Sequence, residues 1–506
     1  MSRFLKYIFL LPLLLWVITF AAQDKPVVTV VEADQLLFEK NVIDAQRLLG
    51  SVVLKYDDVF LRCDSAHLFS TQDFDAFGSV RINQGDSLLL WGEKLHFDKA
   101  SSTAQMRENI RLKSDEMTLT TDFLDFNMDD DLASFWNGGK IVSTENNNTL
   151  TSESGTYDVN AGRFHFKEDV LLKNPDYTVH ADTLIYSDKV ERAWFLGPTT
   201  IDSKDAQIYC ENGWFDTLTQ MCQFNENALI ISGATTMAGD SISYNGDNGA
   251  GEVFCNVRIQ DTTSHYVITG DYGWHSEQEG RSFVTDRALM IQIFDTDSLA
   301  LHADTLLALT DSLDRKTIHA YHGVRFYKED LQGLADSLTF SEKDSLLTMF
   351  VNPTVWSEAN QIAGDTIQLK TYDGKIDKLY VRKNAFVTSE AVLGKYNQIK
   401  GLTLEGNFIE NKLSRIDVSG NGQVVYFPLD GESEEPRTIG VNNAACSNLS
   451  IYVNDNKIER VSMINKPSGA LHPNSLASKE DKELQGFFWN SELRPLSVGD
   501  LFNDRE

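Results

Sequence analysis

Apolar and polar residues alternate along most of the chain between residues 26 and 430. In one clear example, Leu338 and Phe340 alternate with Ser337 and Thr339. A period of two residues is typical of strands that bury one face and expose the other. Clusters of Gly, Asn, Asp and Pro separate these segments and indicate tight turns. The pattern therefore predicts an all-β fold of short strands, with almost no helix in this region.

A short phrase recurs along the same region. It consists of a small residue, an acidic residue, usually Ser or Thr, an aliphatic residue, any residue, and an aromatic or aliphatic residue, as in residues 181–186, 239–244 and 335–340. Successive copies lie about 30 residues apart, which is typical of a linear array of one supersecondary unit. The acidic position, called the acidic slot below, is occupied by Asp34, Asp64, Glu93, Asp122, Asp182, Glu211, Asp240, Asp271, Asp304, Asp336 and Asp365, with Ser154 in a degenerate copy.

Each repeat has room for about two strands joined by tight turns. Two strands cannot bury an apolar face alone, so successive units must stack on each other. We therefore expect an elongated antiparallel β-jelly roll or solenoid of about twelve two-stranded repeats over residues 24–430, with one continuous apolar interior. The array forms either one body or two sub-arrays.

The acidic slot has two interpretations. The first is a turn or edge residue whose carboxylate bonds nearby amides, with Ser or Thr assisting. The second is a ladder of metal ligands, but one carboxylate per repeat cannot surround a calcium ion with the six or more oxygens that it takes. We therefore favour the first interpretation and expect no metal and no cofactor.

The chain begins with the features of an export signal. Arg3 and Lys6 precede an apolar run from Tyr7 to Phe20, and a small-x-small cleavage pattern follows. The run is shorter than the ~20 residues of a spanning helix. We therefore expect residues 1–23 to be a cleaved signal peptide rather than a retained membrane anchor.

The net charge excludes one class of partner, and the positions of the cysteines indicate which of them are buried. The sequence holds 45 Lys and Arg against 74 Asp and Glu, and this net charge of −29 excludes nucleic acid as a partner. Three of the five cysteines, Cys63, Cys210 and Cys446, stand where other repeats carry Ala or Gly, so we expect small buried residues. For Cys210 and Cys222, the sequence leaves two alternatives, a disulfide bond and two free thiols.

The sequence lacks the motifs of common enzyme classes. It has no nucleophile elbow, no phosphate-binding loop and no zinc-protease helix motif, and its ten histidines are dispersed singly. We therefore expect no catalytic residues and a protein that is not an enzyme. Two rival functions remain: a structural or adhesive β-solenoid of the cell envelope and, with less support, a polysaccharide-active enzyme that uses a pair of slot carboxylates.

The repeat also resembles a known family. Phe77-Gly78-Ser79-Val80-Arg81-Ile82, followed by a polar turn, and Arg107-Glu108-Asn109-Ile110-Arg111-Leu112 are similar to the repeats of the OstA/LptA family of lipopolysaccharide-transport proteins. The likeness covers roughly residues 27–430, and the length resembles the long OstA-like proteins of Bacteroidetes-type bacteria. No series of lipid-facing strands follows the repeats, so the likeness does not extend to an outer-membrane barrel.

The resemblance implies a twisted β-jelly roll in the periplasm, either free or associated with the outer membrane, that carries lipopolysaccharide for outer-membrane assembly. An apolar groove would take the acyl chains of lipid A. Its candidate lining residues are Leu95, Phe97, Leu124, Phe126, Leu184, Tyr186, Ile242, Tyr244, Leu338 and Phe340. An ordinary closed core is the alternative for each of them.

The resemblance further implies like-folded partners at the open strand edges, in inner- and outer-membrane complexes, and head-to-tail self-association. The segment Val27–Val31 is the candidate donor edge, unless its own neighbouring tail covers it.

For residues 431–506, the sequence predicts a different organisation, namely a β-hairpin followed by a tail. The tail contains a short predicted helix between Asn474 and Gln485 and ends in the apolar residues Phe487, Phe488 and Trp489. It either docks back on the array as a cap or binds a partner.

Overall fold

A computed structural model describes residues 27–503, apart from 39–42, 57–58, 85–87, 115–116, 144–147, 188, 205, 217, 246, 264, 277, 296, 314, 373–374, 410–411, 431–436 and 455–456. The signal-peptide prediction lies outside these residues. The chain divides into two compact units, Met1–Gly251 and Glu252–Glu506. The predicted boundary between repeats and C-terminal segment, at residue 430, stays a prediction.

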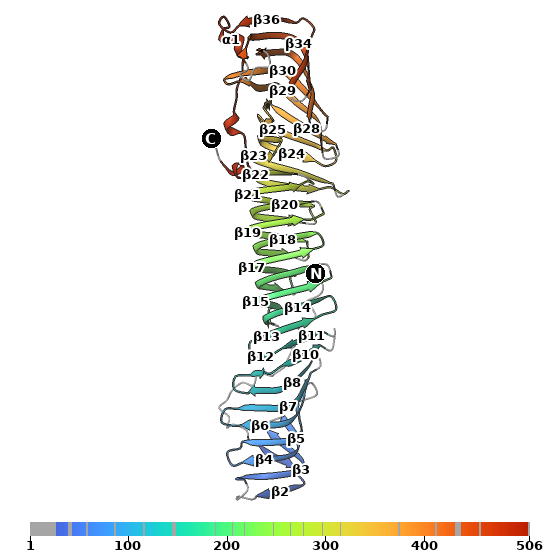
Figure 1. Ribbon diagram of the computed structural model, residues 1–506. Coiled ribbons are helices and arrows are strands. Elements are labelled where there is room, and N and C mark those ends of the chain that lie inside the picture. Colours follow the sequence, from blue (N-terminus) through green and yellow to red (C-terminus); the bar gives the residue numbers. More distant parts are fainter. Residues whose placement is uncertain are drawn as a thin grey trace. The chain divides into compact units, whose positions relative to one another are not determined.

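Unit 1 is built from strands alone in its described part (Figure 1). Its strands are β1 (Thr29–Glu32), β2 (Gln35–Phe38), β3 (Ala45–Tyr56), β4 (Val59–Phe69), β5 (Phe74–Gln84), β6 (Leu88–Asp98), β7 (Thr103–Lys113), β8 (Met117–Asn127), β9 (Leu132–Phe135), β10 (Gly139–Ser143), β11 (Thr149–Ser152), β12 (Ser154–Asp158), β13 (Arg163–Lys173), β14 (Tyr177–Ser187), β15 (Arg192–Ser203), β16 (Gln207–Asp216), β17 (Met221–Ser232) and β18 (Thr235–Asn245).

Unit 2 continues the same pattern and ends in three short helices. Its strands are β19 (Ala250–Asp261, which begins at the unit boundary), β20 (Tyr266–Ser276), β21 (Arg281–Ile293), β22 (Ser298–Thr310), β23 (Lys316–Lys328), β24 (Leu331–Ser341), β25 (Leu346–Phe350), β26 (Thr354–Ser357), β27 (Asn360–Ala363), β28 (Thr366–Tyr372), β29 (Lys375–Val392), β30 (Lys395–Ile409), β31 (Lys412–Tyr426), β32 (Leu429–Asp430), β33 (Arg437–Thr438), β34 (Gly440–Asn454), β35 (Lys457–Ile464) and β36 (Ser468–Pro473), and its helices are α1 (Lys479–Lys482), η2 (Ser491–Leu493) and η3 (Val498–Phe502).

Within each unit, successive strands pair antiparallel. In unit 1, β4 pairs with β3 on one side and β5 on the other, and in unit 2, β22 pairs with β21 and β23 in the same way. The predicted fold class, an antiparallel β-jelly roll of repeated hairpins, is confirmed.

Every long strand bends near its middle, and the bend is a β-bulge. In the pair β3–β4, Leu49 lies opposite Ser65 and Val52 opposite Cys63, so the two residues between Leu49 and Val52 face the single residue Asp64. Two residues against one is the definition of a bulge, which bends and twists a sheet. The same shift recurs between β4 and β5, where two residues again face Asp64.

In most bulges both residues have left-handed backbone conformations, whereas in the bulge of β15 only Gly197 does, because Pro198 follows it. Such pairs recur through both units as Gly50–Ser51, Gly78–Ser79, Glu108–Asn109, Asn137–Gly138, Glu168–Asp169, Glu226–Asn227, Cys255–Asn256, Asp286–Arg287, His322–Gly323, Val351–Asn352, Lys383–Asn384, Gly420–Asn421 and Asn465–Lys466. A left-handed residue other than glycine costs about 1–2 kcal/mol, so a bulge of this kind needs support from its surroundings.

The acidic slot supplies this support. The Asp122 carboxylate accepts a hydrogen bond of 3.1 Å from the backbone amide of Asn109, and the Asp64 carboxylate accepts one of 3.2 Å from the Ser79 hydroxyl. A Cβ built on Gly78 would lie 2.4 Å from an oxygen of Asp64, so this carboxylate packs directly on the bulge. The interpretation as a residue that bonds nearby amides is confirmed for Asp122.

One assignment from the sequence was wrong. Ser152 pairs with Gly139 and Gly155 with Phe135, so the residue in the acidic slot of this repeat is Glu153 and not Ser154. The Glu153 carbonyl accepts a hydrogen bond of 2.9 Å from the Gly138 amide. Gly155 obscured the pattern because it replaces an aliphatic residue, and the Phe135 ring occupies the space where its side chain would lie.

The bend also reverses which residues face inward. Leu61 and Cys63 are buried before Asp64, whereas Ala66 and Leu68 are buried after it. Because strict alternation would place 61, 63, 65 and 67 on one face, the bulge is what keeps both halves of the strand facing the same interior. Each unit is therefore one sheet folded into two leaves along a corner formed by the bulges and acidic slots.

The small residue before each slot lies inside this corner. A Cβ at Gly270 would lie 2.5 Å from Val284, so the corner excludes larger side chains. Cys63, Cys210 and Cys446 are buried there, as predicted. Cys210 and Cys222 are both free thiols, and burial raises the pKa of each to about 12.

The C-terminal tail runs back along the outer surface of unit 2. Gln398 donates to the Lys482 carbonyl (2.9 Å) and accepts from the Leu484 amide (2.8 Å). Gln361 makes the same two bonds, to the Phe488 carbonyl (3.2 Å) and from the Asn490 amide (2.9 Å).

Beyond these two glutamines, the tail continues to β22, where the Phe502 ring lies 4.6 Å from that of His302. The tail thus docks on the array, along its face rather than as an end cap.

We predict that Asp122→Ala loosens its corner. The Asn109 amide loses a charged acceptor, a bond that contributes about 1.5–3 kcal/mol. Hydrogen exchange at Asn109 and Ile110 should therefore accelerate at least tenfold. The matched control is Asp130→Ala, at an exposed turn residue, and equal exchange in both variants would contradict the role of the slot.

We also predict that Gln361→Ala releases the middle of the tail. The Asn490 amide then lacks its buried acceptor, which costs about 1–3 kcal/mol, so its hydrogen exchange should accelerate about ten- to hundredfold. Gln278→Ala, at an exposed glutamine, is the control. Unchanged protection at Asn490 would show that other contacts hold the tail.

Candidate functional site

The ten groove residues predicted from the sequence lie, in each unit, on the inner face of the leaf that follows the acidic slots. Each pair follows an acidic slot, on β6, β8, β14, β18 and β24. Seven of them are at most 6% exposed, namely Leu95, Phe97, Leu124, Leu184, Tyr186, Ile242 and Leu338. The remaining three, Phe126, Tyr244 and Phe340, are half-buried. The structure thus places the ten residues in the interior, and their contact with a lipid stays a prediction.

The opposite leaf contributes an equal share of the interior, which the sequence reasoning missed. In every repeat after the first, the residue three positions before the slot faces inward, and these residues are Leu61, Leu90, Leu119, Leu150, Val179, Ile208, Met237, Ile268, Leu301, Gly333 and Ile362. All but Gly333 are apolar and large. An apolar residue three positions before the slot recurs with the same spacing as the slot itself, and this recurrence could have identified the inward residues of the opposite leaf.

The connection between the two leaves along the corner differs from that along the opposite side. Along the corner, every strand passes from one leaf to the other, so the backbone is continuous. On the opposite side lie the turns that connect the strands, in two rims, one on each leaf. In the described part of the chain no strand pairs across these rims. We call this line, where the two rims meet, the seam.

Side-chain contacts close the seam. In unit 1, the Val28 amide donates a 3.0 Å hydrogen bond to the Gln72 side chain, and the rings of Tyr56 and Phe97 lie 5.0 Å apart. In unit 2, the Lys316 ammonium lies 5.4 Å from the Tyr266 ring. Each of these contacts is worth only about 1 kcal/mol, and unlike the corner the seam has no continuous backbone across it in the described part of the chain.

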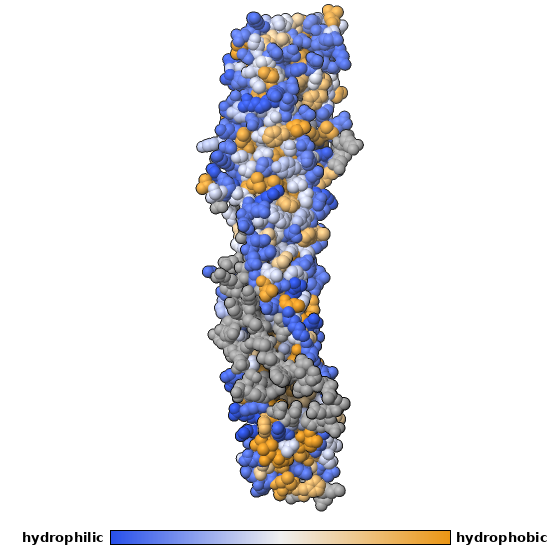
Figure 2. Space-filling model, turned by 180° about the vertical axis from the view of Figure 1, so that it is seen from behind, coloured by the Kyte–Doolittle hydropathy of each residue, from blue (hydrophilic) through white to orange (hydrophobic). Residues whose placement is uncertain are grey.

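The interior is also exposed at the first strands of unit 1. Leu36 and Phe38 on β2 pair with inward positions of β3, yet they are 56% and 58% exposed. Val27 and Val31 beside them are exposed as well, and Figure 2 shows hydrophobic side chains at this end of the unit. Among the described residues, β1 and β2 pair with β3 alone.

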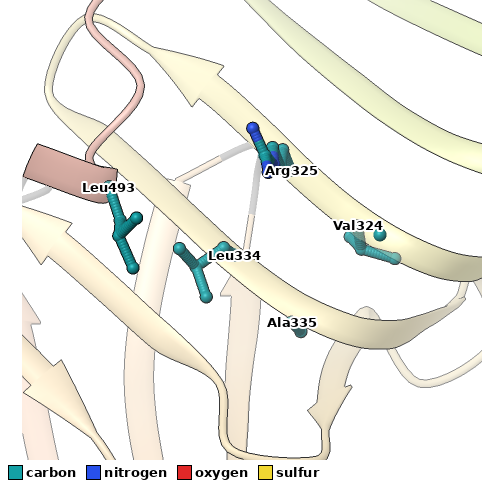
Figure 3. Close-up of a pocket in the computed structure, with 6 residues that line it drawn as sticks. Val324, Arg325, Leu334, Ala335 and Leu493 are labelled. Carbon is teal, nitrogen blue, oxygen red and sulfur yellow. The ribbon is translucent and has the colours of Figure 1, made fainter. Parts of the chain in front are cut away.

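A small cavity lies under the tail in unit 2. Its volume is about 200 Å³, and Figure 3 shows Leu493 of η2 pointing toward Leu334 of β24. Arg325 lies at its side, and its guanidinium donates a hydrogen bond to the Asn503 carbonyl. Two of its lining residues, Val324 and Ala335, belong to the same buried core cluster as the predicted residue Leu338.

No group of three or more His, Cys, Asp or Glu residues in the described part could hold a metal ion. The same residues include no helix of the length and apolarity that a membrane span needs.

Comparison with known protein families finds one match. Residues 25–182 match the model of the family described as OstA-like protein. No curated protein matches the chain. A similar solved structure is LptH, the LptA-homologous periplasmic component of the lipopolysaccharide transport device of Pseudomonas aeruginosa, which shares 12% identity over 29% of this chain and 99% of its own. Its TM-score of 0.22 is too low to carry an argument. The family match confirms the resemblance found in the repeats over residues 25–182, where the chain is similar to OstA-like proteins.

Proposed function

We propose that this protein binds lipopolysaccharide and hands it on in the periplasm, and that it does so without catalysis. The observation that carries the proposal is the apolar interior of a segment similar to OstA-like proteins, along one side of which no strands pair in the described part of the chain. Acyl chains would occupy the space between the leaves, while sugars and phosphates stay in water.

The hydrophobic effect makes such shielding necessary. Burial of one CH₂ group is worth about 0.8 kcal/mol, so a single twelve-carbon chain in water costs roughly 10 kcal/mol. A lipid with several chains therefore cannot cross an aqueous space unprotected. Since the interior is filled by its own side chains, the lipid must part the leaves, and its acyl chains would then take over the apolar contacts that the two leaves had made with each other.

The half-buried residues Phe126, Tyr244 and Phe340 lie toward the rim of their leaf. They are the members of the predicted set that an entering acyl chain would meet first. Leu184 and Leu338, which are buried nearer the corner, would contact the chain only after the leaves have separated.

The exposed first strands suggest how lipid passes between proteins. The exposed interior residues Leu36 and Phe38, next to the free edge of β1 and β2, fit the end of another folded sheet of the same kind. The partner is a like-folded transport protein or a second copy of this chain. The segment Val27–Val31 stays the candidate donor edge.

The enzyme alternative finds little support in the slot carboxylates. Asp64 and Asp122 face the bulges of their neighbouring strands and bond to them, so they do not form a pair across a cleft. A structural or adhesive solenoid remains the rival function, and it predicts no bound lipid.

We predict that the purified mature protein carries lipopolysaccharide in stoichiometric amount, as measured by mass spectrometry of a lipid extract. Tyr244→Glu should retain at least tenfold less, because a carboxylate in an apolar interior costs several kcal/mol. Ser243→Glu, on the outer face of the same strand, is the matched control, and circular dichroism reports folding.

If Tyr244→Glu fails to fold, the pair Phe340→Glu and Thr339→Glu repeats the comparison in unit 2. A wild-type protein that neither contains lipopolysaccharide nor takes it up would contradict transport and favour the structural solenoid.

We further predict that a covalent link across the seam blocks loading. In a Cys255→Ser background, which removes the exposed thiol, Tyr266→Cys and Lys316→Cys can be joined by a short bismaleimide. The linked protein should take up several-fold less lipopolysaccharide than the same protein before linking, because the leaves can no longer part at this point.

The control for this experiment links two hairpins along one rim. Asp297 and Lys328 form a 2.6 Å ion pair on the same leaf, so Asp297→Cys and Lys328→Cys leave the seam free. Equal loss of uptake from both links would place the entry elsewhere.

A further inference from the structure

A row of basic residues crosses the outer face of unit 1. Strand pairing puts Arg62 opposite Arg81, Arg81 opposite Trp91, and Trp91 opposite Arg111. The row continues through Thr120 to Lys140. These residues come from β4, β5, β6, β7, β8 and β10, and all four basic side chains are exposed.

None of the three arginines has an acidic partner in the described part of the chain. Arg62 makes no hydrogen bond or ion pair there, and the guanidinium groups of Arg81 and Arg111 contact only the Trp91 ring, at 5.6 and 5.8 Å. The first carboxylate toward the N-terminus in the same row is Glu32, and the uncharged Val53 separates it from Arg62.

Among the described residues, no anion offsets the repulsion within this row. Like charges directly opposite each other on neighbouring strands destabilise a sheet. The chain has 74 acidic residues against 45 basic ones, so acidic partners are abundant elsewhere, as in the 2.6 Å pair of Arg107 and Asp125. Arg62 and Arg81 therefore stand together where the rest of the surface would favour an opposite charge.

The Trp91 ring restricts the conformations of the arginine side chains on both sides of it. The ring stands between two guanidinium groups on neighbouring strands, and stacking of this kind restricts the arginine side chains while leaving their N–H groups free to donate. Arginine forks fit the oxygens of phosphate in bidentate geometry. Adjacent strands lie about 4.8 Å apart, so Arg62 and Arg81 can bind one phosphate together, and Arg111 lies about 10 Å from Arg81 for a second.

We propose that this row, Arg62, Arg81, Trp91 and Arg111, is a binding site for clustered phosphate groups. The site lies on the outer face of the sheet, so it is distinct from the apolar interior and stands whether or not the interior carries lipid. The phosphates belong either to a soluble polyphosphorylated molecule or to the head groups of a lipid surface.

The test uses the full mature chain and two probes. The first is inorganic tripolyphosphate, measured by isothermal titration calorimetry, and the second is a vesicle of phosphatidylcholine with phosphatidic acid, measured by co-sedimentation against pure phosphatidylcholine. Arg81→Gln should weaken binding at least tenfold. Arg258→Gln, at an exposed arginine of unit 2, is the control and should leave binding unchanged.

A second readout separates binding from a structural role. Without anion, Arg81→Gln should melt at the same temperature as the wild type or above it, because the repulsion from Arg62 is gone. Tripolyphosphate should raise the melting temperature of the wild type but not of the variant.

Arginine-dependent binding of tripolyphosphate alone identifies a soluble ligand, and arginine-dependent binding of vesicles identifies a lipid surface. Binding of neither probe, or binding that Arg81→Gln leaves intact, would overturn the proposal.

Discussion

The contact between an acidic side chain and a left-handed bulge determines the shape of both units. A straight strand of eleven residues would turn alternate side chains to opposite faces and leave a flat sheet with half its apolar residues in water. The bulge resets the alternation at mid-strand, so that Leu61 and Leu68 face the same interior. Asp64 and Asp122 support conformations that Ser79 and Asn109 would otherwise avoid.

This corner gives the folded sheet two unequal sides. Along the corner the backbone is continuous and hydrogen-bonded, so opening it would break many bonds at once. Along the seam the leaves meet through single contacts, such as that between Tyr56 and Phe97. The proposed lipid uptake depends on this difference, because it requires the leaves to part along the seam while the corner stays intact. In unit 2, Gln361 and Gln398 fasten the tail across the outer face of the strands.

Much of this fold could be predicted from the sequence, because its determinants are local and periodic. Alternation, the acidic slot and the small residue before it are all visible within six residues. The bulge pairs were not visible, since residues as different as Glu108, Asp286 and Lys383 occupy the same left-handed position. Glu153 was misplaced by one residue because Phe135, on another strand, fills the space of a missing side chain.

The path of the tail could not be predicted at all, since it depends on glutamine contacts between residues more than eighty positions apart. The groove residues were found on one leaf and missed on the other for a simpler reason. The aromatic residues after the slot, such as Tyr186, stand out in the sequence, whereas the aliphatic residue before it, such as Val179, is common in every strand.

Site-specific photo-crosslinking along one strand tests the central claim most directly. A benzophenone side chain placed in turn at residues 183, 184, 185 and 186 of β14 would face outward, inward, outward and inward. The account predicts adducts with lipopolysaccharide at Leu184 and Tyr186 and none at Thr183 and Ile185. Adducts at the outward positions, or at all four alike, would contradict an acyl-chain site between the leaves.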